Sequence, residues 1–262
     1  MSSKLYVAEK AALAAGNIIA QSVNFLSKID VSHKAVNNPV SSVDLACEQE
    51  IINIIRKAYP EHSIMAEESG LLNNDTEWQW VIDPLDGTAN FIRGFPHCAV
   101  SIALKHKGFV VLGVIYDPLK NELFTAEKGE GATLNQRKIR VSDHAHLAGA
   151  MLGTGLPFRL DQNIEHDMKV LNILLKEKVH IRRAGAAALD MAYVACGRFD
   201  GFWEFGLAPW DIAAGEIIVR EAGGLVGESD GGTEHLSSGN ILAANIKLFK
   251  IISAKISSLK DI

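Results

Sequence analysis

The stretch Asp83-Pro84-Leu85-Asp86-Gly87-Thr88-Ala89-Asn90-Phe91 begins where the apolar run 80–82 ends. This order indicates a buried strand that carries a polar cluster at its end. Two carboxylates three residues apart, held by a proline and followed by Gly-Thr, suit a hard divalent cation. Mg²⁺ prefers oxygen ligands and shares them with substrate phosphate. The alternative is a solvated turn, since turns favour the same residue types.

Two further acidic segments favour the metal site over the turn. In Met65-Ala66-Glu67-Glu68-Ser69-Gly70, adjacent glutamates follow a short apolar run. Neighbours in a strand point to opposite faces, so we expect Glu67 to reach the metal and Glu68 to be solvated or structural. In Trp210-Asp211-Ile212-Ala213-Ala214-Gly215, an acid begins an apolar helix. Its alternative role is a favourable interaction with the helix dipole.

The composition is that of an ordinary globular protein. The 262 residues are 48% hydrophobic and 22% charged, which excludes a disordered chain, a collagen and a disulfide-stapled miniprotein. A net charge of -5 argues against binding of nucleic acid or anionic lipid through the overall charge of the protein. The longest strongly apolar run, 109–116, is far shorter than the ~20 residues of a membrane-spanning helix. Three cysteines without metal-ligand spacing indicate reduced thiols, and we expect a cytoplasmic protein.

Hydrophobic periodicity predicts two halves that meet near residue 145. Residues 1–145 form a helix-plus-antiparallel-sheet half with most of the acidic candidates, and residues 146–262 an α/β half with Asp211. No Pro- or Ser-rich linker separates them, so we expect a shared core. A loop is expected at 37–40, because Pro39 keeps its predecessor out of helical geometry. The remaining expected elements are helices at 4–26, 42–58, 163–176, 186–196, 210–222 and 246–258, and strands at 78–82, 99–105, 109–117, 122–126 and 241–244.

Other chemistry has weaker support in the sequence. Cys98 follows His97, but no phosphate-loop motif surrounds the pair, and a buried structural thiol is the better interpretation. Gly153-Thr154-Gly155 is too short for a nucleotide fingerprint and is better placed at a cleft or a turn. The basic residues Arg182, Arg183 and Arg198 could serve an interface, and a solvated or dimer-facing charge cluster is the alternative.

The stretches 34–44, 65–70, 80–91 and 210–224 together resemble the inositol monophosphatase family, most closely its bacterial SuhB-type inositol-1-monophosphatase branch. The blocks D-P-L-D-G-T-x-N-F and W-D-x-A-x-G…E-A-G-G carry the resemblance, which covers nearly the whole chain. It implies a layered sugar-phosphatase fold, of the α+β or α/β class, with alternating α-β-α-β-α layers. Lys34 matches a basic residue of the family's metal-site loop.

The resemblance implies a site with two or three Mg²⁺ ions. Glu67, Asp83 and the carbonyl of Leu85 would bind the first ion, and Glu67 would also help a weaker third site. The second ion would be held by Asp83, Asp86 and Asp211.

The family also implies a catalytic pair and a substrate lining. Asp44 and the Thr88 hydroxyl would orient and deprotonate the attacking water, and Glu67 counts with them among the catalytic residues. The backbone N–H groups of Gly87 and Thr88 would take the phosphate. The substrate-facing residues implied here are Gly87, Thr88, Gly185, Ala186, Ala187, Glu204 and Asp211. Ala66, Ala89 and Ala186 depart from frequent family residues, but none of these changes removes a ligand.

The implied activity is Mg²⁺-dependent hydrolysis of a small phosphate monoester, first of all inositol 1-phosphate, by in-line attack of a metal-activated water without a covalent intermediate. Fructose 1,6-bisphosphate and histidinol phosphate are the alternative substrates. The resemblance further implies a homodimer and sensitivity to Li⁺. A binding role toward the transcription machinery is the alternative of a different class.

Overall fold

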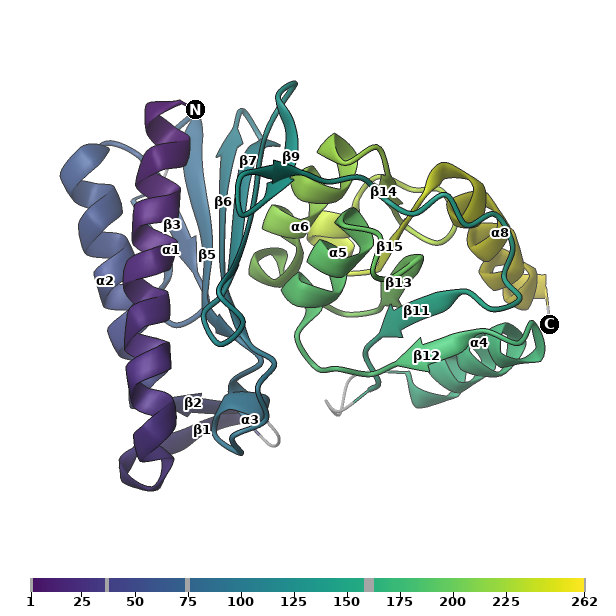
Figure 1. Ribbon diagram of the computed structural model, residues 1–262, viewed down its shortest axis with the longest axis horizontal. Helices are drawn as coiled ribbons and strands as arrows, with labels where there is room; N and C mark the ends of the chain where they lie inside the picture. Colours follow the sequence, from purple (N-terminus) through teal and green to yellow (C-terminus); the bar gives the residue numbers. More distant parts are fainter. Residues whose placement is uncertain (1, 36–37, 74–75, 158–162, 262) are drawn as a thin grey trace.

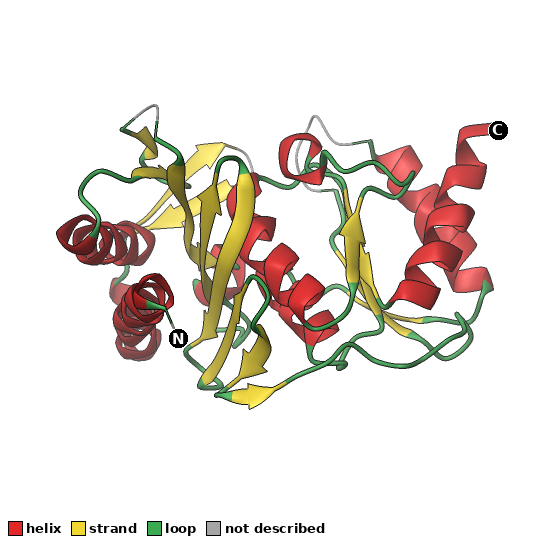
Figure 2. Ribbon diagram, turned by 90° about the horizontal axis from the view of Figure 1, so that it is seen from above, coloured by secondary structure: helices red, strands yellow, loops and turns green. Residues whose placement is uncertain are grey.

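The computed structural model describes residues 2–35, 38–73, 76–157 and 163–261. Helices and sheets alternate in layers, in the order helix, sheet, helix, sheet, helix (Figure 1). The view from above shows the same succession from one end of the molecule to the other (Figure 2). The layered fold expected from the sequence is therefore confirmed.

The first layer consists of α1 (Ser3–Ser22) and α2 (Ser42–Ala58). The buried face of α1 carries Ala8, Ala12 and Ala15 at three- and four-residue spacing, and these small side chains let the helix approach its neighbours closely. The start of α2 is fixed by the Ser41 side chain, which accepts a hydrogen bond from the Val43 N–H at 3.2 Å. Both helices cover one face of the large sheet.

The large sheet is mostly antiparallel. Only its β3–β5 pair is parallel among the described strands, and the strand order is β10-β9-β8-β7-β6-β5-β3-β4. From residue 80 onward β5 is buried, because helices cover both faces of the sheet. The strands are β3 (Ser63–Ala66), β4 (Gly70–Leu72), β5 (Trp78–Asp86), β6 (Ala99–His106), β7 (Phe109–Asp117), β8 (Glu122–Glu127), β9 (Gly131–Leu134) and β10 (Arg137–Lys138). The short helix α3 (Thr88–Phe91) follows β5.

The middle layer, α5 (Ala187–Ala195) and α6 (Pro209–Glu221), lies between the two sheets. Every residue of α5 is buried, because the helix is mostly apolar and lies between two sheets; Asp190 is its one charged residue. One core cluster joins side chains of the large sheet, both helices and the smaller sheet. The two halves of the chain therefore share a continuous core.

The smaller sheet has the strand order β12-β11-β13-β15-β14, with parallel pairs on either side of β11 and antiparallel pairs on either side of β15. Helices α4 (Ile164–Lys176) and α8 (Ile246–Ser257) form the outermost layer. The strands are β11 (Met151–Thr154), β12 (His180–Arg182), β13 (Gly201–Glu204), β14 (Leu225–Gly227) and β15 (Ile241–Ala244). Short helical segments complete the chain: η1 (Val23–Lys28), α7 (His235–Ser238) and η2 (Ser258–Asp261).

Two sequence expectations were wrong in detail. Of the loop expected at 37–40, residues 38–40 belong to β2 (Asn38–Ser41), which pairs antiparallel with β1 (Val31–Ala35), and residue 37 lies outside the described residues. A proline is tolerated there because this hairpin forms a sheet of its own, in which Pro39 lies on an edge strand. The helix expected at 4–26 ends at Ser22, and a 3₁₀ segment with a kink at Phe25 follows. The division near residue 145 stays a prediction; the large sheet ends at Lys138 and the smaller one begins at Met151.

None of the described helices is both long enough and apolar enough to cross a membrane.

The packing of α6 on β7 depends on Gly113. A Cβ atom at this position would lie 2.6 Å from both the Ala214 carbonyl oxygen and Ile217 Cγ2. Gly113→Ala should therefore lower the free energy of unfolding by about 1–3 kcal/mol through overpacking, measured by urea denaturation. Phe109→Ala on the same strand, where the side chain is 72% exposed, is the control and should change stability by less than about 0.5 kcal/mol. Equal stability of the two variants would contradict this close contact.

Candidate active site

The parallel pairing of β3 and β5 brings two acidic segments together. Ala66 pairs with Ile82, and the Glu67 N–H continues the ladder by donating to the Ile82 carbonyl at 3.1 Å. The carboxyl ends of parallel strands meet at one edge of a sheet, so Glu67 lies beside Asp83. A hydrogen bond between these two carboxyl groups requires that one of them holds a proton, and the contact with Glu67 accordingly raises the pKa of Asp83. The expectation that Glu67 rather than Glu68 faces this site agrees with the position of Glu67 in the cleft lining.

Asp211 reaches the same place from the first turn of α6. Its carboxylate accepts a hydrogen bond from the Ala208 N–H at 2.7 Å, which caps the helix. The Trp210 carbonyl accepts a hydrogen bond from Ser101 Oγ at 3.2 Å, which ties the start of α6 to β6. These contacts fix Asp211 opposite the end of β5. We call Glu67, Asp83, Asp86 and Asp211 the acid cluster.

The acid cluster lines a cleft of about 410 Å³. The cleft includes every site residue implied by the resemblance except Asp44, which lies behind it with no exposed surface. Sequence reasoning missed a further group of lining residues, namely Pro39, Asn90, Ile92, Arg93, Arg183 and Leu207. Gly155, which the sequence placed at a cleft or a turn, also lines it.

Burial and like charge act together on the acids of the cleft. Desolvation raises the pKa of Asp83 well above its usual value, and the carboxylates of Glu67, Asp86 and Asp211 raise it further. The pKa of Asp86 is likewise raised, first by burial and then by Asp211, against a hydrogen bond from the Ala188 N–H at 2.8 Å. Such crowding of buried carboxyls is costly for the fold and is typical of sites that bind a cation or perform acid–base chemistry.

The donor set fits Mg²⁺, because every side-chain donor of the acid cluster is a carboxylate oxygen. Leu85 also lines the cleft, and its carbonyl oxygen lies 3.0 Å from Thr88 Oγ1, whose single hydroxyl hydrogen it shares with Asp44 Oδ1. Within the described residues, no three acidic, histidine or cysteine side chains are already arranged as a metal site. A bound cation would relieve the mutual repulsion of these carboxylates.

Asp44 and Thr88 form a hydrogen-bonded pair next to the acid cluster. Thr88 Oγ1 donates to Asp44 Oδ1 at 2.7 Å. The other oxygen, Asp44 Oδ2, accepts from the Ser41 N–H at 2.9 Å and the Ser41 hydroxyl at 2.5 Å. Burial raises the pKa of Asp44, although these hydrogen bonds oppose the shift. The structure thus brings together the two residues that the resemblance pairs.

The turn after β5 requires glycine at position 87. Gly87 has a φ of 87°, which other residues rarely adopt. A Cβ atom here would also lie 2.8 Å from the His97 carbonyl oxygen. The turn therefore packs directly on the segment that leads into β6, and Thr88 starts α3 from a fixed position.

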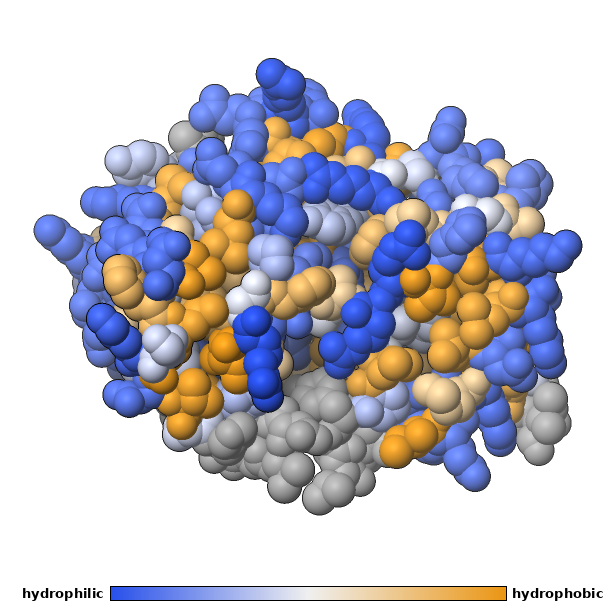
Figure 3. Space-filling view, turned by 60° about the horizontal axis from the view of Figure 1, so that its bottom comes forward, coloured by the Kyte–Doolittle hydropathy of each residue, from blue (hydrophilic) through white to orange (hydrophobic). Residues whose placement is uncertain are grey.

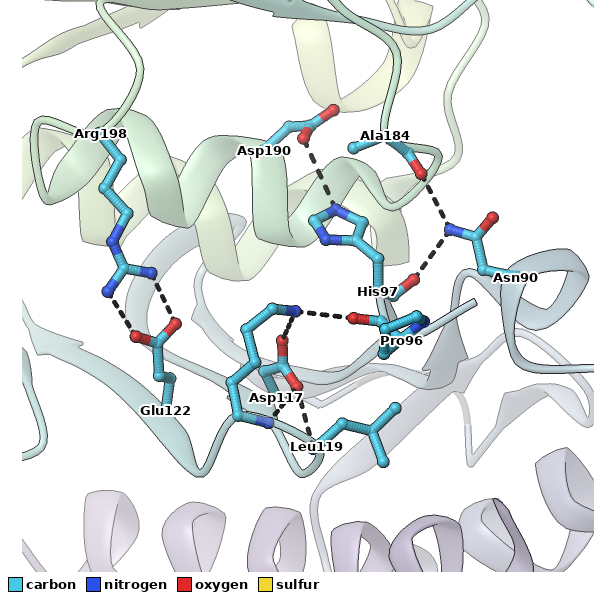
Figure 4. Close-up of polar contacts among 10 residues, drawn as sticks. Asn90, Pro96, His97, Asp117, Leu119, Glu122, Ala184, Asp190 and Arg198 are labelled. Atoms are coloured by element: carbon cyan, nitrogen blue, oxygen red, sulfur yellow. Dashed lines mark hydrogen bonds and ion pairs between the residues drawn. The ribbon is translucent and has the colours of Figure 1, made fainter. Parts of the chain in front are cut away.

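Asn90 connects this turn to the start of α5 (Figure 4). Its Nδ2 lies 2.8 Å from the His97 carbonyl oxygen and 2.9 and 3.2 Å from the carbonyl oxygens of Ala184 and Gly185. These contacts place the segment 185–187 at the cleft. Sequence reasoning missed this role because Ala184 is 94 residues away along the chain.

Glu204 enters the cleft from the end of β13. Its carboxylate packs against Gly155, where any side chain would overlap it. Glu204 also contributes to the raised pKa of Asp86. Glu204 thus stands at the same cleft as the acid cluster, as the resemblance implies.

The remaining sequence candidates have other surroundings. Burial raises the pKa of Cys98 to about 12, so the thiolate needed for nucleophilic chemistry is disfavoured. Arg198 pairs with Glu122, with Nη1 and Oε2 2.6 Å apart (Figure 4). Arg183 lines the cleft. The side chain of Lys34 lies outside the described residues.

Figure 3 shows the lower side of the molecule as drawn in Figure 1, and this face carries both hydrophilic and hydrophobic side chains. Hydrophilic side chains run across it between hydrophobic patches (Figure 3).

Comparisons with known proteins agree over nearly the whole chain. The model of the inositol monophosphatase family matches residues 1–260. A Pseudomonas aeruginosa protein named Nus factor SuhB is 50% identical over 257 residues, which are 96% of this chain and 95% of the relative. The crystal structure of the extragenic suppressor protein SuhB from Bartonella henselae is 40% identical, with a TM-score of 0.94 over 97% of this chain and 98% of that one. The structure of inositol monophosphatase from Anabaena (Nostoc) is 40% identical, with a TM-score of 0.87 and coverages of 98% and 96%.

The raised pKa values of Asp83 and Asp86 predict how a divalent cation changes stability with pH. Without a cation, the folded chain keeps protons on these two carboxyl groups that the unfolded chain loses near pH 3.9. Their contribution to the free energy of unfolding is therefore lost as the pH rises through the raised pKa values of the folded state. Mg²⁺ competes with those protons. At a hundredfold excess over its Kd at pH 8, Mg²⁺ should raise Tm by roughly 5–10 °C, and by less at pH 5.

Differential scanning fluorimetry in the presence and absence of Mg²⁺ measures this shift, with NaCl at equal ionic strength as the control. Equal effects of Mg²⁺ and NaCl, or equal effects of Mg²⁺ at both pH values, would contradict cation binding by the acid cluster.

Proposed function

The chain belongs to the inositol monophosphatase family of phosphatases, and from this premise we propose that it is a Mg²⁺-dependent hydrolase of small phosphate monoesters, with inositol 1-phosphate as the favoured substrate. The observation that carries the proposal is the meeting of the acid cluster with the Asp44–Thr88 pair in one cleft. Carboxylates beside an oriented hydroxyl provide both cation binding and water positioning.

The acid cluster and the Leu85 carbonyl would hold two or three Mg²⁺ ions. When bound, divalent cations lower the pKa of a coordinated water and stabilise the charge on the leaving oxygen. These effects are needed because phosphate monoesters are among the slowest compounds to hydrolyse without a catalyst.

Asp44 and Thr88 would orient the attacking water. Thr88 Oγ1 donates a hydrogen bond to Asp44 Oδ1 at 2.7 Å, which leaves a lone pair of the same oxygen to accept a hydrogen bond from water. Burial raises the pKa of Asp44 and thereby favours proton uptake by this carboxylate. The water would attack the phosphorus in line, without a covalent intermediate.

The rest of the cleft suits a polyol phosphate. The N–H groups of Gly87 and Thr88 would bind phosphate oxygens, and the segment 185–187 would lie along the substrate. Glu204 offers a carboxylate to a ring hydroxyl, and Asp211 borders the same space. The inositol monophosphatase from Anabaena, at 40% identity, supports inositol 1-phosphate as the first substrate to test.

Fructose 1,6-bisphosphate is a second candidate because two arginine side chains border the cleft. Arg93 and Arg183 are exposed residues of the lining, and neither forms an ion pair with another described residue at 4.0 Å or less. Guanidinium groups are well suited to a second phosphate. Histidinol phosphate carries an amine instead, which Glu204 could accept.

A binding role toward the transcription machinery is supported by the name Nus factor SuhB of the relative from Pseudomonas aeruginosa. Such a role could accompany catalysis, since the acid cluster is complete. Homodimer formation and inhibition by Li⁺ remain parts of the same proposal, and Li⁺ would compete with Mg²⁺ for the carboxylates.

Replacing Asp86 by Asn should abolish Mg²⁺-dependent phosphate release. Removal of a residue that only supports a metal ligand costs up to about 100-fold, so loss of a direct ligand should lower kcat/KM by more than about 100-fold. The fold should stay intact and its cation-free Tm should not fall, because the change removes one charge from a crowded cluster. Asp30→Asn, at an exposed position, is the control and should keep full activity. An active Asp86→Asn variant would refute the ligand assignment.

Arg93→Ala should distinguish the two substrates. If this side chain binds a second phosphate, kcat/KM for fructose 1,6-bisphosphate should fall by roughly 10-fold, the value of one charge-assisted hydrogen bond. The value for inositol 1-phosphate should change by less than about 2-fold. Arg198→Ala, whose side chain pairs with Glu122, is the matched control. Equal losses for both substrates would contradict a second-phosphate role.

A further inference from the structure

His97 and Asp190 form a buried pair that the proposed chemistry does not use. His97 precedes β6 and is 6% exposed, whereas Asp190 lies in the first turn of α5 and is 1% exposed. His97 Nε2 and Asp190 Oδ1 are 3.8 Å apart and face each other between the segment before β6 and α5 (Figure 4). Neither atom has a hydrogen-bond partner within the described residues. Burying such groups is costly, so the pair calls for an explanation.

On the His97 side, the pair is joined to the turn after β5. The His97 carbonyl oxygen is 2.8 Å from Asn90 Nδ2. The same oxygen is the atom that excludes any side chain at Gly87. A displacement of His97 is therefore transmitted to the turn that carries Thr88.

On the Asp190 side, the pair is joined to the acid cluster. The Asp190 N–H donates to the Ala186 carbonyl at 3.0 Å, in the first turn of α5. Two residues before Asp190, the Ala188 N–H donates to Asp86 Oδ2 at 2.8 Å. The position of this helix end therefore determines whether Asp86 keeps its hydrogen bond. The same helix end carries the segment 185–187, which lines the cleft.

The groups around the pair favour a charged Asp190 at neutral pH. Burial raises the pKa of Asp190 to about 6, while His97 and Arg183 act to lower it. Asp190 and Asp86 repel each other. The ring of Tyr193 lies edge-on to His97, with ring centroids 5.8 Å apart. Without His97, the repulsion from Asp86 would displace Asp190 and the start of α5 away from the acid cluster. The attraction between His97 and Asp190 opposes that displacement.

We propose that His97 and Asp190 are positioning residues that hold the N-terminus of α5 against Asp86 and so preorganise the cation site. The function of the pair as part of a phosphatase rests on the function proposed above. The positional claim itself concerns only the contact between α5 and Asp86. Loss of either partner should free the Ala188 N–H and weaken cation binding, whereas a pair that only fills the core would affect global stability alone.

The test uses the full chain with His97→Gln, Asp190→Asn and the double variant. His235→Gln is the matched control, because His235 and Glu216 form another buried pair, with Nε2 and Oε2 3.3 Å apart. Hydrogen exchange at the Ala188 amide reports the contact with Asp86. Calorimetric titration with Mg²⁺ in the absence of substrate reports cation affinity, and thermal melting reports global stability.

In both single variants, the Ala188 amide should exchange at least about 10-fold faster and the Kd for Mg²⁺ should rise about 10-fold, as for other outer partners of metal sites. In the double variant, the changes in Ala188 exchange rate and in the Kd for Mg²⁺ should be no larger than in the more affected single variant, because the two residues act as one unit. His235→Gln should lower Tm without changing either local readout. If one variant fails to fold, the other single variant decides.

Unchanged Ala188 exchange and Mg²⁺ affinity in a folded His97→Gln or Asp190→Asn variant would overturn the proposal. Equal changes in His235→Gln would also overturn it, because they would reflect general destabilisation. Phosphate release by the unaltered chain is measured in parallel. If that chain binds Mg²⁺ but hydrolyses no ester, the proposed function fails while the exchange data still decide the positional claim.

Discussion

Repulsion among four crowded carboxylates, two of them buried and two half-buried, is the constraint that the rest of the structure accommodates. Glu67, Asp83, Asp86 and Asp211 come from three segments of the chain and crowd into one cleft, where burial and mutual charge raise the pKa values of Asp83 and Asp86. Backbone N–H groups offset part of this cost, since Ala188 donates to Asp86 and Leu85 donates to Asp83. A divalent cation would offset much more of it.

The layered fold explains how such a cluster can form. The parallel neighbours β3 and β5 end at the same edge of the large sheet, and α5 and α6 start at that edge from the middle layer. Because one core cluster spans both sheets and these helices, the two halves cannot shift independently without disturbing the cleft. The buried His97–Asp190 pair lies at this junction, next to the hydrogen bond by which the Ala188 N–H of α5 contacts Asp86.

The sequence contained most of the site but little of its support. Asp83, Asp86 and Thr88 stand in one short motif, and Glu67, Asp211 and Asp44 each lie in a segment that resembles the family, so local sequence was sufficient to find them. The partners of Asn90 and Asp190 could not be predicted, because these contacts join residues that are distant in the chain and depend on how the layers pack. The hairpin of β1 and β2 was missed for a similar reason, since Pro39 suggests a loop unless its edge position is known.

The most direct test of the account is phosphate release from inositol 1-phosphate by the purified chain. It should be measured after removal of divalent cations with EDTA and again after Mg²⁺ is restored, with fructose 1,6-bisphosphate and histidinol phosphate in parallel and Li⁺ added last. The account predicts that release is negligible without cation, returns with Mg²⁺, is fastest for inositol 1-phosphate and falls with Li⁺. Equal release with and without Mg²⁺, or no release from any ester by a protein that binds Mg²⁺, would contradict it.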